Sequence, residues 1–278
     1  MEPLVTVVVP YYNHQYYVID ALKSIYSQSY KNIQVIIIDD CSSDAGYQII
    51  HDFINERCLD WTFLRNDKNI GLIRTIKRSL NYIEGDYVCI LASDDQWLNE
   101  KVELQVHTMV NAKVDCISAG YEEIPSGKKF KVPMFIEYSS NDIIYGNYFM
   151  PALNLMWSAQ RFKLIASEMK EDIGLEDYHM LLAQSLVYGS VYCLPEVLGK
   201  YRIHDNNTSS NRDFIYQKKC QIIKSFIDKG KVLPTSALDF QTAIFLKRSS
   251  KYLELIKFLF FRPKMVLIFI KVKLAKKY

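Results

Sequence analysis

Two pairs of adjacent carboxylates are the residues of this chain whose type and spacing could carry chemistry. Asp39-Asp40 directly follows the apolar run 35–38, and Asp94-Asp95 follows the apolar run 87–91 after Ala92 and Ser93. Adjacent carboxylates repel each other, so each pair requires a cation or hydrogen-bond donors. A nucleotide with a bound divalent metal supplies both, because its ribose or base edge can donate to one pair and its metal-bound diphosphate can lie at the other. The pairs therefore suggest an enzyme that acts on an activated nucleotide.

Each pair also has an ordinary structural interpretation. Residues 42–44, which follow the first pair, are of the types that form turns and helix caps. Asp95 or Asn99 could cap the helix that follows the second pair. Taken singly, the pairs do not decide between a binding site and a helix start.

Weaker candidates lie in two loops and one helix. A proline, an aromatic ring and an amide after the first strand could form a shelf for a nucleobase, or an ordinary strand-to-helix loop. A later glycine permits close approach of the backbone or a positive φ, and a lysine one helix further on could reach a diphosphate or lie solvated on the surface. These residues are Pro10, Tyr12, Asn13, Asn69, Gly71 and Lys77.

Three further polar residues lie in the second half of the chain. Glu176 and Asp177 open a predicted helix, where the helix dipole favours carboxylates even without a function. A fixed, ionised carboxylate is also what a general base for a sugar hydroxyl requires. His204 follows a short extended segment. A lone histidine is more often structural, yet a neutral imidazole can complete a metal site.

The elements that must position these residues follow from the hydrophobic pattern. Continuous β-branched runs are typical of parallel strands buried on both faces, with ligands at their carboxyl ends. Segments with helical spacing separate four such runs, which predicts a doubly wound, mostly parallel α/β sheet. The strands are predicted at residues 4–9, 35–38, 61–64 and 87–91, with further extended segments at 115–119, 191–193 and 198–203. A helix is predicted at 176–188, and the chain beyond residue 212 is expected to be helical.

Composition narrows the class of protein. With 49% hydrophobic residues in 278, the chain is long enough for one large packed domain or one domain with an appendage. The six cysteines form no Cys-x-x-Cys and several lie in apolar runs, so we expect reduced core residues and a cytoplasmic protein. Met1 leads almost directly into a strand without a basic segment, so no signal peptide is expected.

Six motifs occur in one order along residues 4–210, and together they are more specific than any one of them. They are Val7-Val8-Val9-Pro10-x-Tyr12-Asn13, Asp39-Asp40-x-Ser42, Asn69-x-Gly71, Ser93-Asp94-Asp95, Glu176-Asp177 and Tyr201-Arg202-x-His204. In this order the chain resembles the inverting family 2 glycosyltransferases of the GT-A fold, which build bacterial surface polysaccharides. The resemblance implies a GT-A-like, doubly wound sheet flanked by helices, and the sequence beyond residue 212 predicts a helical, basic C-terminal extension.

The resemblance also implies a role for each candidate residue. A nucleotide-sugar, with UDP as the expected nucleotide, would be bound by Pro10, Tyr12, Asn13, Asp39, Asp40, Asn69, Gly71, Lys77 and Asp94. Asp95 and His204 would hold Mn²⁺ or Mg²⁺. Asp177 would be the catalytic base, with Glu176 placing it or the acceptor. The reaction would be one in-line displacement at the anomeric carbon, with inversion.

Domain limits and partners are implied in the same way. The catalytic domain would span residues 1–212, with a nucleotide-sugar half at 1–110 and an acceptor half at 111–212, and residues 213–278 would form the C-terminal region. The expected acceptor is a saccharide, carried on a polyprenyl diphosphate lipid. Processive synthases of the family carry Gln-x-x-Arg-Trp and membrane spans, which this chain lacks. Transfer of a single sugar is therefore expected.

Four residues, at three places in the chain, depart from the family's usual pattern. Ala92 lies where many members have the first Asp of an Asp-x-Asp, and Cys41 replaces a frequent Gly or Asn. Ile76-Lys77 lies where Arg-Asn is common. The departures affect donor contacts, because the carboxylate expected to bind the metal is retained.

The C-terminal region holds the basic charge of the chain. From Lys247 to Tyr278 there are ten Lys or Arg and one Glu, against a net charge of +3 for the whole chain. Its uncharged stretches are shorter than the ~20 residues needed to span a bilayer. It could lie on an anionic membrane, which places the protein at the inner face of the cell membrane, or it could pack on the catalytic domain. Aliphatic residues interleave with the basic ones, so nucleic acid is not an expected partner.

Other protein classes fit less well. A non-catalytic nucleotide-sugar-binding partner subunit would retain the two acidic pairs and is the main alternative. A receiver or phosphatase-like domain lacks a counterpart of Glu176-Asp177. A dinucleotide oxidoreductase would need Gly-x-Gly-x-x-Gly after its first strand, which this chain does not have.

Overall fold

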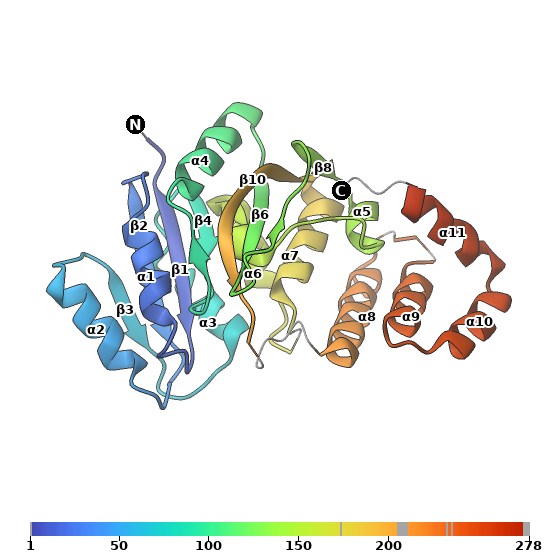
Figure 1. Cartoon of the computed structure of the whole chain (residues 1–278), viewed down its shortest axis with the longest axis horizontal. Helices are drawn as coiled ribbons and strands as arrows, with labels where there is room; N and C mark the ends of the chain where they lie inside the picture. The colour runs from blue at the N-terminus through green and yellow to red at the C-terminus, as the bar shows by residue number, and fades with distance from the viewer. Residues whose placement is uncertain (1, 173, 205–210, 232, 235, 275–278) are drawn as a thin grey trace. The chain divides into compact units, whose positions relative to one another are not determined.

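The computed structural model describes residues 2–172, 174–204, 211–231, 233–234 and 236–274 (Figure 1). Their contacts define two compact units. Unit 1 comprises Met1–Glu137, Phe149–Glu171 and Val191–Ile203, and unit 2 comprises Tyr138–Tyr148, Asp172–Ser190 and His204–Tyr278. The two units interleave along the sequence. The expected domain limit at residue 212 remains a prediction.

Unit 1 contains the β-sheet, whose main path over the described residues runs β3-β2-β1-β4-β9-β6-β10-β5. β1 is parallel to β2 and β4, and β2 is parallel to β3, which confirms the four predicted parallel strands. β9 runs antiparallel between β4 and β6, and β10 is parallel to β6. The bounds are β1 Val5–Tyr11, β2 Ile33–Asp39, β3 Thr62–Arg65, β4 Tyr87–Ile90, β5 Gln96–Trp97, β6 Cys116–Ile124, β7 Lys129–Phe130, β8 Ile136–Tyr138, β9 Met156–Ser158 and β10 Val191–Arg202.

Helices cover both faces of this sheet. Alternate residues of a strand point to opposite faces, and the odd-numbered residues of β1 pack with α1, α2 and α4 in one cluster. α3 and α6 contact β1, β2, β4 and β9, and also each other, on the opposite face. The bounds are α1 Val18–Tyr26, α2 Gly46–Glu56, α3 Leu72–Ser79, α4 Lys101–Ala112, η1 Ala152–Asn154 and α6 Ala159–Glu168.

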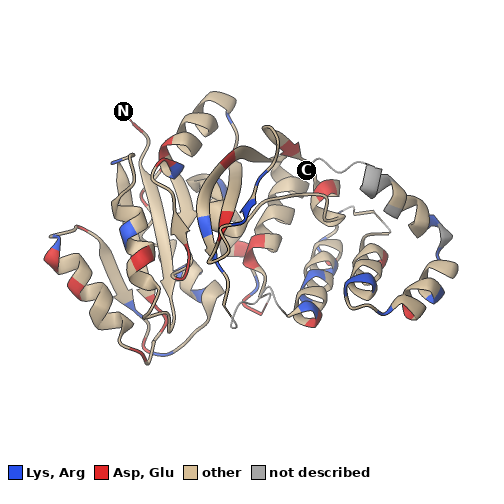
Figure 2. Ribbon diagram, in the orientation of Figure 1, with Lys and Arg blue, Asp and Glu red and all other residues tan. Residues whose placement is uncertain are grey.

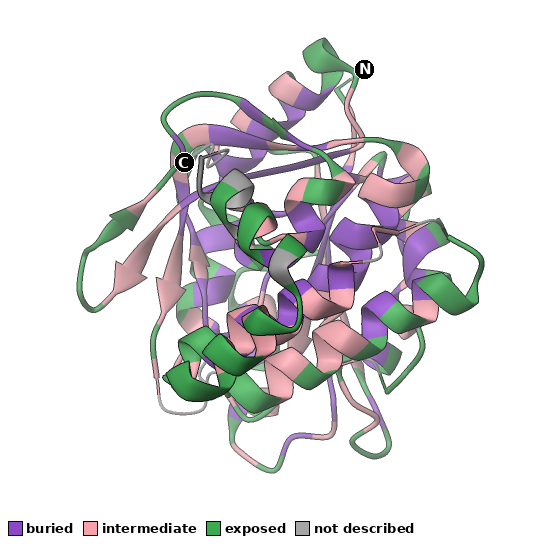
Figure 3. Cartoon of the chain, turned by 90° about the vertical axis from the view of Figure 1, so that its right-hand side faces the viewer, coloured by how far each residue is buried: buried purple, intermediate pink, exposed green. Residues whose placement is uncertain are grey.

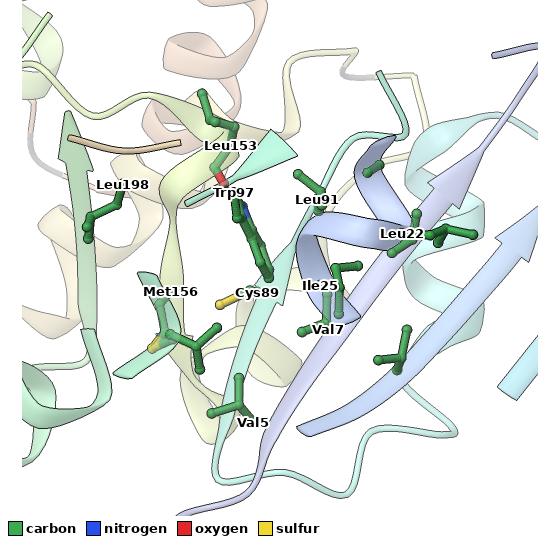
Figure 4. Close-up of a cluster of buried hydrophobic side chains, with 14 of the residues drawn as sticks. Val5, Val7, Leu22, Ile25, Cys89, Leu91, Trp97, Leu153, Met156 and Leu198 are labelled. Atoms are coloured by element: carbon green, nitrogen blue, oxygen red, sulfur yellow. Dashed lines mark hydrogen bonds between the residues drawn. The ribbon is translucent and has the colours of Figure 1, made fainter. Parts of the chain in front are cut away.

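The core of unit 1 lies where the strands meet α1 and α4. Figure 4 shows Trp97 among Leu91, Leu153 and Cys89, and its indole Nε1 donates to the carbonyl of Leu153 at 2.7 Å. The predicted spacing of α1 is confirmed, because its apolar positions Val18, Ala21, Leu22 and Ile25 are all buried. This packing makes the sheet a rigid frame for the loops at its strand ends.

Pro10 lies inside β1 and does not end it, which corrects the prediction. In the register of the sheet Pro10 is opposite Ile38 of β2. The carbonyl of Val8, two residues earlier, accepts the N–H of Leu91 on the β4 side, and β4 itself ends at Ile90. Alternate residues of a strand direct their backbone N–H toward the same neighbouring strand, so Pro10 faces the β4 side as Val8 does. Because β4 has already ended there, the missing N–H of Pro10 costs no hydrogen bond between these strands.

Unit 2 is helical, as expected for the end of the chain. Its elements are α5 Ser140–Ile144, α7 Glu176–Ala183, the π-helical turn η2 Gln184–Tyr188, α8 Arg212–Asp228, α9 Ala237–Arg248, α10 Tyr252–Phe260 and α11 Pro263–Leu274. Figure 2 shows Lys and Arg on α8, α9 and α10. Within the described residues, no helix combines the length and the apolar character needed to cross a bilayer.

Candidate active site

Hydrogen bonds join the loops that follow β1 and β2. Asn13 adopts φ 54°, a conformation that asparagine tolerates better than most residues. Its backbone N–H donates to Ser42 Oγ at 3.0 Å, and its side-chain oxygen accepts the N–H of Ser43 at 2.9 Å. The side chain of the preceding Tyr12 is 47% exposed. Asn13 therefore shapes the joined loops, and the Tyr12 ring is available for stacking.

Asp39 is a buried carboxylate at the end of β2. Its Oδ1 accepts the N–H of Ser42 at 2.9 Å. Arg65 Nε lies 3.2 Å from Oδ2 as an ion pair, without the geometry of a hydrogen bond, so within the described residues Oδ2 accepts none. Arg65 also donates to the carbonyl of Ser42. Asp39 thus joins the ends of β2 and β3, and its Oδ2 retains a lone pair for a further donor.

The carboxylate of Asp40 binds the loop between β3 and α3. Its Oδ1 accepts the N–H of Ile70 at 2.8 Å and the amide of Asn66 at 2.7 Å, and its Oδ2 accepts the N–H of Gly71 at 2.8 Å. Gly71 has φ 85°, a conformation that glycine adopts without strain. In this structure Asp40 therefore fastens a loop.

Two weaker candidates, Asn69 and Lys77, make no hydrogen bond to the two acidic pairs among the hydrogen bonds found in the described residues. Asn69 is exposed in the loop that Asp40 holds. Lys77 lies half-buried on α3. Arg74 above all, and then Lys77, lowers the pKa of Glu171. Among the described residues, the charge of Lys77 therefore acts on the carboxylate of Glu171.

Asp94 and Asp95 lie between β4 and β5, both largely buried. Asp95 Oδ1 accepts the backbone N–H of Arg202 at 2.9 Å, and Arg202 Nε donates to the carbonyl of Asp94 at 2.9 Å. Burial, and then the charge of Asp94, raises the pKa of Asp95 to about 8. A nearby cation would let both carboxylates ionise, so the pair is suited to a metal.

The helix-cap interpretation of this acidic pair is wrong. The following helix, α4, begins at Lys101 and its N-cap residue is Glu100, which makes no side-chain capping bond. Neither Asp95 nor Asn99 occupies the cap position. The burial of the pair is therefore not explained by a helix start.

His14 is a candidate that the sequence did not reveal. Its Nδ1 forms a hydrogen bond of 2.9 Å with Ser93 Oγ, across 79 residues of sequence, and lies 4.0 Å from Asp94 Oδ1. A possible signal was its place directly after Asn13, at the carboxyl end of β1 beside the other strand ends. Unit 1 thus gathers an imidazole and two carboxylates, a donor set that suits a divalent transition metal.

The end of β10 leads to the predicted metal ligand His204. β10 pairs with β5 directly after the second acidic pair, with Gly199 opposite Trp97. Arg202, its last residue, contacts both aspartates of that pair. His204 follows two residues later and belongs to unit 2.

Glu176 and Asp177, the acidic pair of α7, form the first turn of that helix in unit 2. Both are half-buried, and Asp177 Oδ1 accepts the N–H of Tyr178 at 2.7 Å. Burial and then Asp177 raise the pKa of Glu176 to about 7. Burial also raises the pKa of Asp177, opposed by the N–H of Tyr178 and the charge of Lys219. With a pKa of about 7, the carboxyl of Glu176 can exchange a proton near neutral pH.

Comparison with known proteins decides the family. The sequence model described as Glycosyl transferase family 2 matches residues 6–171, more than half of the chain. The chain belongs to glycosyl transferase family 2. The family match confirms the resemblance drawn from the six motifs, and a member of this family is a glycosyltransferase.

Relatives and solved structures agree with this assignment. TuaG of Bacillus subtilis, a glycosyltransferase named for teichuronic acid biosynthesis, is 28% identical over 76% of this chain and 83% of its own length. WfgD of Escherichia coli, a UDP-Glc:α-D-GlcNAc-diphosphoundecaprenol β-1,3-glucosyltransferase, is 23% identical over 81% of this chain and 87% of its own.

A solved structure shows the same fold. The mannosyltransferase PcManGT of Pyrobaculum calidifontis, in complex with GDP-Man and Mn²⁺, has a TM-score of 0.67 at 17% identity, covering 96% of this chain and 81% of its own. The predicted GT-A-like α/β fold is therefore confirmed for this family 2 glycosyltransferase.

Proposed function

We propose that the chain is a metal-dependent, inverting and non-processive transferase in the biosynthesis of a bacterial surface polysaccharide. It moves one sugar from a UDP-sugar to a hydroxyl of a saccharide acceptor carried on a polyprenyl diphosphate lipid. The activities for which TuaG and WfgD are named support the pathway, the nucleotide and the lipid-linked acceptor. The family membership supports the reaction type.

The observation that carries the proposal is the burial of two adjacent carboxylates beside an imidazole. Asp95 is 4% exposed and Asp94 9%, and burial with the second charge holds the pKa of Asp95 at about 8. The residues fit Mn²⁺ or Mg²⁺, with Asp95 and His204 as proposed ligands and His14 as an additional one. The metal would neutralise charge on the departing diphosphate.

The nucleoside is proposed to bind at the joined loops of β1 and β2. Asp39 Oδ2 retains an acceptor lone pair, and the exposed ring of Tyr12 offers a stacking surface. Asn13 joins these two loops, Asp40 holds the loop between β3 and α3, and Pro10 lies near the end of β1 beside them. Asn69, Gly71, Lys77 and Asp94 complete the proposed nucleotide-sugar site.

Asp177 is proposed as the general base. It takes the proton of the acceptor hydroxyl, and the oxygen attacks the anomeric carbon from the face opposite the leaving nucleoside diphosphate. The new bond forms as the old one breaks, so an α-linked donor gives a β-linked product. Glu176, beside it in the first turn of α7, would place the base or the acceptor.

Two substitutions and one binding measurement test this function. Asp95→Asn should remove Mn²⁺-dependent UDP binding, measured by calorimetry, and reduce transfer by at least about 100-fold. Asp177→Asn should leave that binding within about twofold and still reduce transfer by about 100-fold or more, since general-base catalysis contributes ~10²–10⁴. Undiminished transfer by either variant would refute the assignment.

The alternative of a non-catalytic nucleotide-sugar-binding subunit makes a different prediction. The unmodified chain would then bind UDP with metal, yet neither transfer nor slowly hydrolyse any nucleotide-sugar in a screened set. Hydrolysis that depends on both metal and Asp177 would exclude this alternative.

The C-terminal helices are proposed to attach the enzyme to the inner face of the cell membrane. α10 has no buried residue, and Figure 3 shows much of the C-terminal helices exposed. Large apolar side chains of α10, α11 and the turn between them are exposed: Tyr252, Leu253, Ile256, Phe260, Phe261, Val266, Leu267 and Ile270. We call this set the C-terminal apolar surface. Lys257, Arg262 and Lys264 lie among these residues and are exposed as well. An anionic lipid surface would bury the apolar side chains and attract the basic ones.

A further inference from the structure

Helix α8 holds the segment that leads into the acidic pair of α7. Lys218 Nζ donates to the backbone oxygen of Asp172 at 2.5 Å, and Gln221 Nε2 donates to the carboxylate of Asp172 at 3.0 Å. Gly174, with φ 69°, packs so closely on α8 that an added Cβ would lie 3.1 Å from Phe214 Cζ. All of these contacts are inside unit 2, so α8 fixes the start of α7.

Lys219 brings a positive charge to this same turn. Its Nζ lies 4.5 Å from the centre of the Tyr178 ring and 6.0 Å from that of the Tyr148 ring. Tyr178 directly follows Asp177 and donates its N–H to that carboxylate. Aromatic rings attract an ammonium group and restrict its position. The ammonium group of Lys219 is therefore held against the ring of the residue that directly follows Asp177.

Within the part of the chain that the structure describes, Lys219 is the cation whose charge acts on Asp177. Burial raises the pKa of Asp177, and after the N–H of Tyr178 it is Lys219 that lowers it. Glu176 is the other acid of the turn. α5, which packs against α7, brings Asp142, whose carboxylate accepts hydrogen bonds from Ser139 and Asn147.

Asp177 acts on Lys219 in return. Burial lowers the pKa of Lys219 to about 8, while the charge of Asp177 opposes this shift and the charge of Arg248, on α9, adds to it. Lys219 is therefore protonated at neutral pH and loses its charge in the alkaline range. Its charge can therefore favour the ionised form of Asp177 at neutral pH.

We propose that Lys219 is a positioning residue whose ammonium group, held against the rings of Tyr178 and Tyr148, favours the ionised form of the Asp177 carboxylate, the form that accepts the acceptor's proton. The inference rests on the proposed role of Asp177 as general base. Lys219 itself touches no reacting atom. It acts by setting the pH at which Asp177 is free to take a proton.

The pH dependence of transfer by the full chain tests the proposal. In Lys219→Met the midpoint of the acidic limb of kcat should rise by about one pH unit, because a nearby opposite charge lowers a carboxyl pKa by ~1–3 units. At pH values well below both midpoints transfer should then be about tenfold slower, and above about pH 8, where Lys219 loses its own proton, it should be close to that of the unmodified chain. Lys219→Arg, which keeps the charge, should restore the midpoint.

A matched control separates this effect from general loss of charge. Lys224 lies on α8 as well and is exposed, so Lys224→Met removes the same charge from the same helix. It should leave the midpoint unchanged. An unchanged midpoint in Lys219→Met, or an equal shift in Lys224→Met, would overturn the proposal.

A second measurement does not depend on transfer. The side-chain carboxyl carbon of Asp177 can be titrated by ¹³C NMR in the unmodified chain and in Lys219→Gln, a neutral polar variant. A rise of about one unit in the titration midpoint supports the proposal, and no rise refutes it. If Asp177→Asn retained transfer, the proposed function would fail, while this titration would still decide the relation between Lys219 and Asp177.

Discussion

Asp95 is held in a place that disfavours its charge. Burial and the adjoining carboxylate of Asp94 raise the pKa of Asp95, whereas the N–H and the charge of Arg202 lower it. Residues of functional sites often lower stability in this way, because the arrangement that suits the ligand does not suit the empty protein. A metal bound at this place would remove the cost by pairing with both carboxylates.

The pKa of Asp95 therefore predicts how the stability of the metal-free protein depends on pH. Its folded-state pKa, about 8, lies above the ordinary value of 3.8, so the folded chain binds this proton more tightly than the unfolded chain does. The destabilising effect is absent below about pH 4, grows as the pH rises and is complete above about pH 8. The side chain of Asp95→Asn does not titrate, so the stability of this variant lacks this pH dependence.

Urea denaturation in the presence of a chelator measures this effect. Between about pH 5 and pH 8 the free energy of unfolding of the unmodified chain should fall by about 2 kcal/mol or more relative to Asp95→Asn, at ~1.36 kcal/mol per pKa unit. Asp60→Asn, an exposed change, should follow the unmodified chain. Equal pH dependence in all three proteins would contradict the prediction. Added Mn²⁺ should stabilise the unmodified chain at about pH 8 and not Asp95→Asn.

The elements of unit 1 were largely predictable, because a buried parallel strand needs a continuous apolar run and an amphipathic helix needs a 3.6-residue repeat. β2 and β4 therefore appeared in the sequence close to their observed bounds. β9 did not, since three residues within an aromatic segment carry no periodicity, and its place between β4 and β6 depends on long-range pairing. His14 was missed for a similar reason, because its neighbour Ser93 is remote in sequence.

The loop between β3 and α3 depends on Asp40 and yields a prediction at this scale. Asp40→Asn replaces one acceptor oxygen by an NH₂ group, which would face donors already directed at that position. Loss of charged hydrogen bonds should destabilise the chain by about 2 kcal/mol, as bonds to charged groups contribute ~1.5–3 kcal/mol each. Thermal denaturation measures this change, and amide exchange of Ile70 and Gly71 should become faster.

Asp67 provides the control within the same loop. Its side chain is exposed, so Asp67→Asn should change neither stability nor amide exchange of Ile70 and Gly71. Equal effects of the two substitutions would show that the loop does not depend on the carboxylate of Asp40.

At the scale of the whole molecule, the residues of the proposed site could be predicted from the sequence, whereas the division of the chain into two compact units could not. The second acidic pair and Arg202 come from distant segments of unit 1, while the acidic pair of α7 belongs to unit 2. Strand-end motifs can be read locally, because each follows its own apolar run. The division into units cannot, because it depends on which of the interleaved segments pack together.

Membrane attachment is a property of the whole molecule, and the C-terminal apolar surface predicts its form. The full chain should float with vesicles that contain phosphatidylglycerol and not with phosphatidylcholine alone, because each lysine near an anionic surface adds ~1 kcal/mol. Raising the salt to about 0.5 M should weaken binding, since it shortens the screening length. Leu253 and Phe260 are each 78% exposed, so the double change Leu253→Glu and Phe260→Glu should abolish flotation.

The control for this experiment lies in unit 1. Met134 is 64% exposed, and Met134→Glu likewise replaces an exposed apolar side chain by an acid. It should leave flotation unchanged if the C-terminal apolar surface is the contact. Equal binding to neutral and anionic vesicles would show that the basic residues do not contribute to membrane binding. If the unmodified chain did not float with any vesicles, membrane attachment would be refuted. Because the sugar-transfer assay can use an acceptor without a long lipid, the double variant should retain transfer in solution, which separates attachment from catalysis.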